Sequence, residues 1–542
     1  MSRRQEQLRV DQRDTMNTEI FHRWCFSVFI VSLWFQSTPV AAKEIHSNGL
    51  GGGRWSEGST WKGGVVPTAE DDAVISARDT VLFDRDDTEK PTCKQLLLDP
   101  NSNLAFQSGL GRRTLSVDGP VEAYGSIKLH APGAADFMEL RLVAADPADR
   151  VIKLQRGAAL LALGRANLPD GKRNVVLCSP IAPGEKNPSP AELTAVARTM
   201  LDLQHAHVDN LHVSVAGVDN TGAKPNERCN LVGNRFTAFA RLSIQGCDTP
   251  AIVRNEFRAQ KAAMVRPAAL SVVSSPLADI RGNHIIGAYA IGINLSASEC
   301  SVTENLIESC PTGISSHTGQ PMLKQNILRH CNTGMSLRTL TGSAEDTLID
   351  HAVTAVSLAA AKVQLTSIIV TNAVTNKVLH LVSSSLEMLN CNIRPEQVVM
   401  VSTSAKPRNV RGEEPFEAME FLVVGVKGAV PPQTQIEVVT ANPEKPLAPG
   451  ATDLNIRNSP APLRGGLTPL PQTLTPLVLK SWRMQEDGVV VPSPEYILNV
   501  WAPAAEPGAK PRLLKSLKLT PSHTWNRPAP NDPKPTLEIE LP

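Results

Sequence analysis

A short histidine-rich segment holds residues whose types and spacing could do chemistry. In LDLQHAHVDNLHV, alternation on a strand would point the side chains of His205, His207 and Asp209 to one face. Two imidazoles and a carboxylate resemble a facial metal triad with open positions, and His212 could be a fourth ligand. The alternative is a polar outward strand, or histidines that are partly buried and paired with the backbone.

A second candidate group recurs along the chain. His330 and His351 are 21 residues apart and continue a series that begins at Ser309. On stacked strands these side chains would lie about 5 Å apart, where they could bind a metal or transfer protons. The alternative is a pair of solvent-exposed corner residues. Cys310 and Cys331 directly follow Ser309 and His330 in the sequence. These cysteines could form either a buried thiol ladder or a cross-rung disulfide.

An internal repeat would position these residues. Segments that begin at Asn305, Asn326 and Thr347 align without gaps at a period of 21 residues, and an earlier copy begins at Asn283. More degenerate copies begin at Asn234, at Asn255 and near Ser367. A unit of this length is too short for a helix pair but suits one rung of a β-solenoid.

The repeat assigns a role to each position. Apolar residues two, nine and eleven places after the asparagine would stack inside, and the asparagine amide would bond to the neighbouring rung. Glycine eight places on, as at Gly313 and Gly334, would allow a corner with positive φ. Glu308, Arg329 and Asp350 would form one outward column of alternating charge.

This N-φ-I…G-I unit resembles the right-handed parallel β-helix of the pectate-lyase-like superfamily, over roughly residues 200–400. The resemblance implies an all-β fold, with a right-handed single-stranded parallel β-helix over 136–403 and its clearest repeats over 230–395. Members of the superfamily include lyases with calcium-binding carboxylates and hydrolases with several aspartates on neighbouring rungs. In this chain no acidic cluster recurs at the rung period, and Asp209 and Asp219 are the nearest candidates for catalysis, beside His330 and His351. No cofactor is expected, while calcium or another divalent metal is compatible with the resemblance.

The preceding region, residues 43–135, consists of short strand-like segments with Gly or Asp between them. It resembles the extracellular eight-glycine domain through Trp55, Trp61, Gly63, Gly64, Pro67, Asp72, Val74, Gly119 and Gly125. Trp55 and Trp61 could bind a ligand by stacking on sugar rings, or could plug the open end of a β-stack.

The ends of the chain differ from its centre. Trp24–Phe35 is an apolar run followed by small residues, which predicts a signal peptide over 1–42, with translation starting at Met1 or Met16. Of the 42 prolines, 23 fall after residue 400. They predict a proline-rich linker with some β structure over 404–470 and a small C-terminal β domain over 471–542.

Composition narrows the function classes. Lys and Arg total 54 against 53 Asp and Glu, which disfavours a nucleic-acid partner. We expect a secreted protein without a transmembrane segment in its mature chain, located outside the cell, in the periplasm or at the cell surface. Its predicted function is non-catalytic binding of polysaccharide, cell-surface glycan or matrix material. The alternative is a polysaccharide lyase or glycoside hydrolase.

Overall fold

The computed structural model describes an all-β chain. The described residues are 42–85, 92–107, 112–131, 137–144, 151–164, 175–178, 193–196, 200–209, 212–216, 229–238, 240–247, 249–259, 267–401, 416–422, 424–427, 435–440, 477–484, 489–492, 495–502, 506, 512–520 and 537–541. The expected signal peptide lies outside this part of the chain except for Ala42, and its cleavage stays a prediction.

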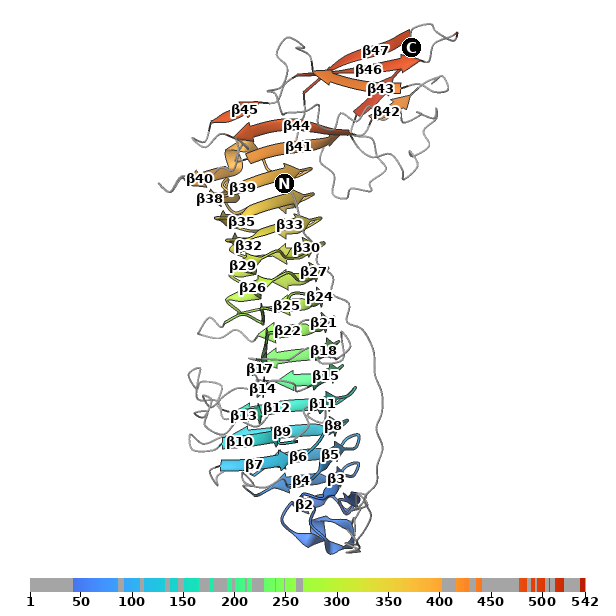
Figure 1. The fold of residues 1–542 in the computed structure, drawn as a ribbon, viewed down its shortest axis with the longest axis vertical. Coiled ribbons are helices and arrows are strands. Elements are labelled where there is room, and N and C mark those ends of the chain that lie inside the picture. Colours follow the sequence, from blue (N-terminus) through green and yellow to red (C-terminus); the bar gives the residue numbers. More distant parts are fainter. Residues whose placement is uncertain are drawn as a thin grey trace, which may run out of the picture. The chain divides into compact units, whose positions relative to one another are not determined.

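Three long sheets form a parallel β-helix over residues 43–401 (Figure 1). Sheet 1 has 17 strands: β1 (Lys43–His46), β3 (Asp71–Ile75), β5 (Gln95–Leu98), β8 (Val121–Ala123), β11 (Val151–Leu154), β15 (Met200–Gln204), β18 (Cys229–Val232), β21 (Ala251–Val253), β24 (Asp279–Arg281), β27 (Ser301–Thr303), β30 (Met322–Lys324), β33 (Thr341–Glu345), β36 (Lys362–Thr366), β39 (Ser385–Leu389), β41 (Phe416–Leu422), β44 (Leu477–Met484) and β45 (Val490–Pro492).

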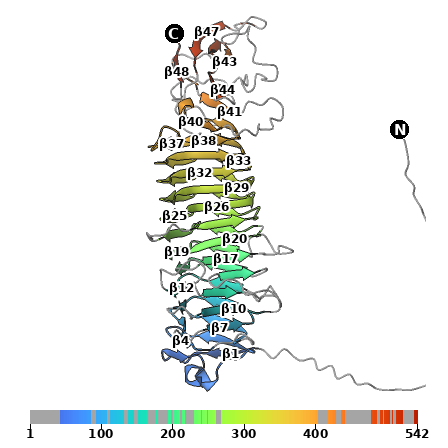
Figure 2. The same ribbon diagram turned by 90° about the vertical axis from the view of Figure 1, so that its left-hand side faces the viewer.

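The other two long sheets have 13 strands each, and Figure 2 shows many of their strands one above another. Sheet 2 contains β2 (Gly52–Arg54), β4 (Thr80–Phe83), β6 (Asn103–Phe106), β9 (Ser126–Ala131), β12 (Ala159–Gly164), β16 (His207–Asp209), β19 (Arg235–Ala238), β22 (Glu256–Ala259), β25 (His284–Ile286), β28 (Leu306–Glu308), β31 (Ile327–Arg329), β34 (Leu348–Asp350) and β37 (Ile369–Thr371). Sheet 3 contains β7 (Arg112–Val117), β10 (Phe137–Leu142), β13 (Val175–Cys178), β14 (Leu193–Val196), β17 (His212–Ala216), β20 (Arg241–Gln245), β23 (Leu270–Val273), β26 (Ile291–Ser298), β29 (Thr312–Gly319), β32 (Thr333–Arg338), β35 (Thr354–Ala359), β38 (Leu379–Val382) and β40 (Val398–Val401).

The strands pair in parallel from rung to rung, which confirms the predicted fold class. In sheet 2, β28 pairs with β31 and β31 with β34, so that Leu306, Ile327 and Leu348 occupy equivalent positions. These positions are 21 residues apart, as the repeat predicts. The right-handed sense of the helix stays a prediction.

Inward-facing aliphatic side chains fill the stack. Leu328, Met335 and Leu337, which hold the three predicted interior positions of their rung, are each at most 1% exposed. One hydrophobic cluster extends from Ile45 to Met484. Branched and unbranched aliphatics suit this interior because each layer must fit within one strand spacing, about 4.8 Å.

A buried asparagine ladder joins sheets 1 and 2. The amide nitrogen of Asn305 donates to Oδ1 of Asn326 at 3.1 Å and to the carbonyl of Ile280 at 2.9 Å. The same contacts recur at Asn234, Asn255 and Asn283. Each side chain therefore satisfies backbone groups that a corner would leave unpaired, and the predicted ladder is confirmed.

The predicted reason for the repeated glycine is wrong. Neither Gly313 nor Gly334 has a positive φ; instead, non-glycine corner residues such as Glu304, Ser309 and Thr318 do, at 57°, 60° and 61°. A Cβ atom on Gly313 would lie 2.7 Å from the carbonyl oxygen of Gly334. Glycine is required here because neighbouring rungs approach closely.

The N-terminal region is continuous with the β-helix. β7 pairs with β10 and β8 pairs with β11, so strand pairing crosses the boundary expected at residue 135 without interruption. Two short 3₁₀ helices, η1 (Gly58–Thr60) and η2 (Lys62–Gly64), follow the terminal strand β2. Residues 43–135 are therefore the first rungs of the stack.

After the 3₁₀ helix η4 (Pro395–Gln397) and β40, the pairing changes. β41 continues sheet 1 in parallel, but β44 and β45 extend it antiparallel. The remaining strands form two small sheets: β43 (Gln435–Thr440), β46 (Tyr496–Ala502) and β47 (Arg512–Leu519), and β42 (Val424–Lys427) with β48 (Leu537–Glu540). A second hydrophobic cluster around Leu498 and Val500 supports the expected C-terminal β domain.

Candidate functional site

Sheet 3 presents a column of small polar side chains on its outer face. In six successive strands from β20 to β35 the register aligns Ser243, Ser271, Asn294, Ser315, Ser336 and Ser357. Each of them is half-buried. Because neighbouring strands lie about 4.8 Å apart, the six positions extend over about 24 Å.

A threonine column and a distinct charge pattern accompany these side chains. Thr312, Thr333 and Thr354 align in β29, β32 and β35, where Thr312 and Thr333 are half-buried and Thr354 is buried. From β17 to β40, the described strands of sheet 3 contain no Asp or Glu, although they contain Arg241 and Arg338. Across the same rungs, carboxylates lie in the strands of sheets 1 and 2. The described strands of sheet 3 from β17 to β40 thus present hydroxyl and amide groups and no carboxylate.

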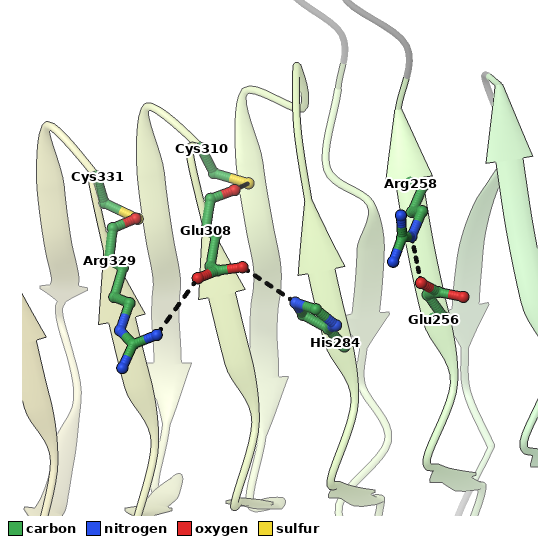
Figure 3. A network of polar contacts seen from close by, with 7 residues as sticks. All are labelled: Glu256, Arg258, His284, Glu308, Cys310, Arg329 and Cys331. Atoms are coloured by element: carbon green, nitrogen blue, oxygen red, sulfur yellow. Dashed lines mark hydrogen bonds and ion pairs between the residues drawn. The ribbon is translucent and has the colours of Figure 1, made fainter.

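Sheet 2 carries most of the described ion pairs of the central rungs. Figure 3 shows Nε2 of His284 and Nη1 of Arg329 on either side of Glu308, at 3.1 and 3.6 Å from its carboxylate oxygens. Glu308, Arg329 and Asp350 occupy one column, as predicted. Such partly exposed ion pairs each contribute at most about 1 kcal/mol to the free energy of unfolding. Their main effect is therefore to place opposite charges next to each other on neighbouring rungs.

The two predicted histidines lie side by side on adjacent rungs, with their rings tilted. The ring centroids of His330 and His351 are 4.7 Å apart, with 37° between the ring planes. Nδ1 of His351 lies 3.0 Å from Oδ2 of Asp350. Desolvation opposes ionisation of Asp350, but hydrogen bonds from Thr371, Asn372 and His351 outweigh it and lower the pKa of Asp350 to about 2. The pair is exposed to solvent, as one alternative predicted.

The predicted metal triad does not share one strand face. β16 begins at His207, and His205 is the corner residue before it, with φ of 51°. The left-handed corner breaks the alternation on which the prediction depended. His207 and Asp209 do lie on the outer face, where both contact the Thr237 hydroxyl. Asp219 lies outside the described residues, as does the side chain of His212.

The described residues contain no group of three or more His, Cys, Asp or Glu side chains arranged to hold a metal ion. The calcium or other divalent metal that the superfamily resemblance allows therefore stays untested.

Trp55 and Trp61 are core residues. They are 0% and 2% exposed, with ring centroids 4.9 Å apart. Phe83 packs against Trp55, and the indole nitrogen of Trp61 donates to the Trp55 carbonyl at 2.9 Å. Burial leaves no ring face for a sugar, so the ligand-binding prediction is wrong. Both residues follow β2, the terminal strand of sheet 2, and their role as a plug of the β-stack stays a prediction.

Cys310 and Cys331 form the buried thiol ladder rather than a disulfide. Both are free thiols and are 1% exposed. Burial raises the pKa of Cys310 to about 12 and that of Cys331 to about 11. Neither thiol has the lowered pKa of a reactive cysteine.

A polar cluster on the outer face of sheet 1 has no counterpart in the sequence-based expectations. Glu122, Lys153 and Asp202 align in β8, β11 and β15. Tyr124, whose side chain is 38% exposed, donates to Glu122 at 3.0 Å, and this hydrogen bond raises the pKa of Tyr124. Asn230 donates to Asp202 at 3.1 Å. The long, unequal insertions between these strands hide the alignment in the sequence.

These features define the chain as a parallel β-helix protein with three chemically different outer faces. No family model matches it, and neither a curated protein nor a solved structure matches it significantly. The resemblances to the pectate-lyase-like superfamily and to the eight-glycine domain thus remain predictions. Within the described residues, no helix is long and apolar enough to cross a membrane.

Proposed function

We propose that the protein is an exported, non-catalytic binder of polysaccharide or of cell-envelope or matrix material, and that the outer face of sheet 3 is its binding surface. The supporting observation is the column of Ser243, Ser271, Asn294, Ser315, Ser336 and Ser357, in a region of sheet 3 whose described strands, β17 to β40, contain no Asp or Glu. Hydroxyl and amide groups both donate and accept hydrogen bonds, which suits a polymer of hydroxylated sugars.

The size of the surface also supports a polymeric ligand. Each hydroxyl contact with a ligand is weak, because it replaces a contact with water. A column of about 24 Å allows many such contacts at once, so useful affinity requires a ligand that reaches several rungs.

The alternative, a glycoside hydrolase or lyase, has one observation in its favour. Glu122 and Asp202 lie two rungs apart on sheet 1. Two strand spacings place their backbones about 9 to 10 Å apart, near the upper end of the carboxylate separation in inverting glycosidases. Lys153 lies between them, and each carboxylate accepts hydrogen bonds from neighbouring side chains.

A polysaccharide screen separates the two functions. The purified chain is incubated with neutral and anionic polysaccharides, and bound protein, unsaturated products and new reducing ends are measured. The binding proposal predicts retention of the protein on at least one polymer without release of products. Product release that disappears in Glu122→Gln would instead establish the enzymatic alternative.

A further inference from the structure

We propose that His330 and His351 form a surface site for a divalent transition-metal ion, with Cu²⁺ as its strongest ligand. The two imidazoles are on adjacent rungs of the same corner, and both are exposed to solvent. This site is independent of the polysaccharide surface on sheet 3.

The backbone holds the two rings in matching positions. His330 and His351 have almost the same φ, 53° and 55°. The amide of His330 donates to the Asp350 carbonyl at 2.9 Å, and that of His351 donates to the Thr371 carbonyl at 3.1 Å. Because both corners have the same conformation, the rings lie next to each other, tilted by 37° and with their centroids 4.7 Å apart.

The centroid separation of 4.7 Å is short enough for the two rings to share one ion. Metal–nitrogen bonds of 2.0 to 2.1 Å require two imidazole nitrogens on one ion to be at most about 4.2 Å apart. Because both side chains are exposed, rotation about their side-chain bonds can bring one nitrogen of each ring within that limit while the backbone stays in place. Two protein ligands leave the remaining coordination positions to water.

Asp350 orients one of the two ligands. Its carboxylate lies 3.0 Å from Nδ1 of His351 and also accepts hydrogen bonds from Thr371 and Asn372, at 2.8 and 2.9 Å. A proton held on Nδ1 leaves Nε2 with its lone pair available. Metal-binding histidines usually have this carboxylate partner on the nitrogen that does not bind the ion. We therefore assign Asp350 as a positioning residue.

The donor set selects the class of ion. Imidazole nitrogen suits Cu²⁺, Ni²⁺ and Zn²⁺, whereas Ca²⁺ and Mg²⁺ prefer oxygen. At a site with nitrogen donors the affinity is highest for Cu²⁺ among the divalent first-row metals.

The test is a Cu²⁺ titration of the full chain in competition with a chelator. Electron paramagnetic resonance counts the coupled nitrogen nuclei, so its readout does not depend on any activity. The variants are His330→Gln, His351→Gln and Asp350→Asn. His284→Gln is the control, because His284 lies in β25 of sheet 2, outside this corner, and pairs with Glu308 at 3.1 Å. Circular dichroism verifies that each variant is folded.

The proposal predicts one Cu²⁺ equivalent coupled to two nitrogens in the unmodified chain and in His284→Gln. Both His330→Gln and His351→Gln lose the two-nitrogen signal. Asp350→Asn keeps both ligands but binds this equivalent at least about 10-fold more weakly. An unchanged signal and affinity in either ligand variant would overturn the site, and unchanged affinity in Asp350→Asn would overturn the positioning role.

Discussion

At the scale of single residues, the β-helix depends on the buried asparagine ladder, whose side chains hydrogen-bond from rung to rung. The side chain of Asn305 accepts from the backbone and side-chain nitrogens of Asn283, both at 2.9 Å, and donates to the next rung. Unpaired polar atoms in this position would have no water to replace the lost partner. The ladder thus stabilises the corner and fixes which residues pair.

Asn305→Ala tests this role. The substitution removes the acceptor of the Asn283 backbone amide and one of the two acceptors of its side-chain amide, so we expect a loss of about 2 kcal/mol or more in the free energy of unfolding. Urea denaturation measures the change. Asn332→Ala, at an exposed position in the same region, is the control and is expected to change stability by less than about 0.5 kcal/mol. Equal losses of stability in the two variants would contradict the stabilising role of the asparagine ladder.

The thiols of Cys310 and Cys331 give a second prediction at this scale. Because their pKa values lie at about 12 and about 11, both thiols are neutral and unreactive at pH 8. Their contribution to stability is complete below the unfolded pKa of about 9 and is lost as the pH rises through 11 and 12.

Mass spectrometry after iodoacetamide treatment is the measurement for the thiols. We expect no alkylation of either cysteine in the folded chain at pH 8 and full alkylation in guanidinium. Modification of the folded chain as fast as the unfolded one would show that the thiols are accessible.

At the scale of strands and corners, close approach between rungs decides where glycine is needed. Gly313→Ala would place a methyl group 2.7 Å from the Gly334 carbonyl oxygen and 3.2 Å from a Leu328 methyl carbon. We expect a loss of about 1 to 3 kcal/mol, measured by thermal and urea unfolding. Ser315→Ala, on the outer face of β29, controls for the strand itself. A Gly313→Ala variant as stable as this control would disprove the steric explanation.

The sequence predicts elements better than it predicts sites. The regular period from Asn305 onward correctly indicates the parallel pairing, the interior of Leu328 and Met335, and the position of His330 next to His351. Alternation correctly placed His207 and Asp209 together, but not His205, because a strand boundary cannot be read from spacing alone. The tryptophans were ambiguous for a similar reason: burial depends on which strand ends the stack.

The sheet 3 column shows why an aligned surface can escape sequence analysis. Ser315, Ser336 and Ser357 follow the regular period, but Ser243 and Ser271 are separated by 28 residues, since a longer connection intervenes. Serine is also common on the outer faces of strands, so a serine by itself does not indicate a binding surface. Only the register of the strands reveals the column.

At the scale of the whole β-helix, charge is distributed unequally among the three faces. The chain is almost neutral overall, with 54 basic and 53 acidic residues, yet the described strands of sheet 3 lack carboxylates from β17 onward. Sheet 2 carries paired charges, and sheet 1 carries mixed polar clusters. The proposed binding surface on sheet 3 is thus separate from the faces whose charged side chains pair between rungs.

The most direct test of the account is polysaccharide binding by a double variant of sheet 3. Ser315→Glu with Ser336→Glu places two carboxylates on the proposed binding face, while Ser301→Glu with Ser343→Glu places the same charges on sheet 1. On the polymer that retains the unmodified chain, affinity electrophoresis should show at least about 10-fold weaker binding for the sheet 3 variant and unchanged binding for the sheet 1 variant. Equal binding by both variants would contradict the account.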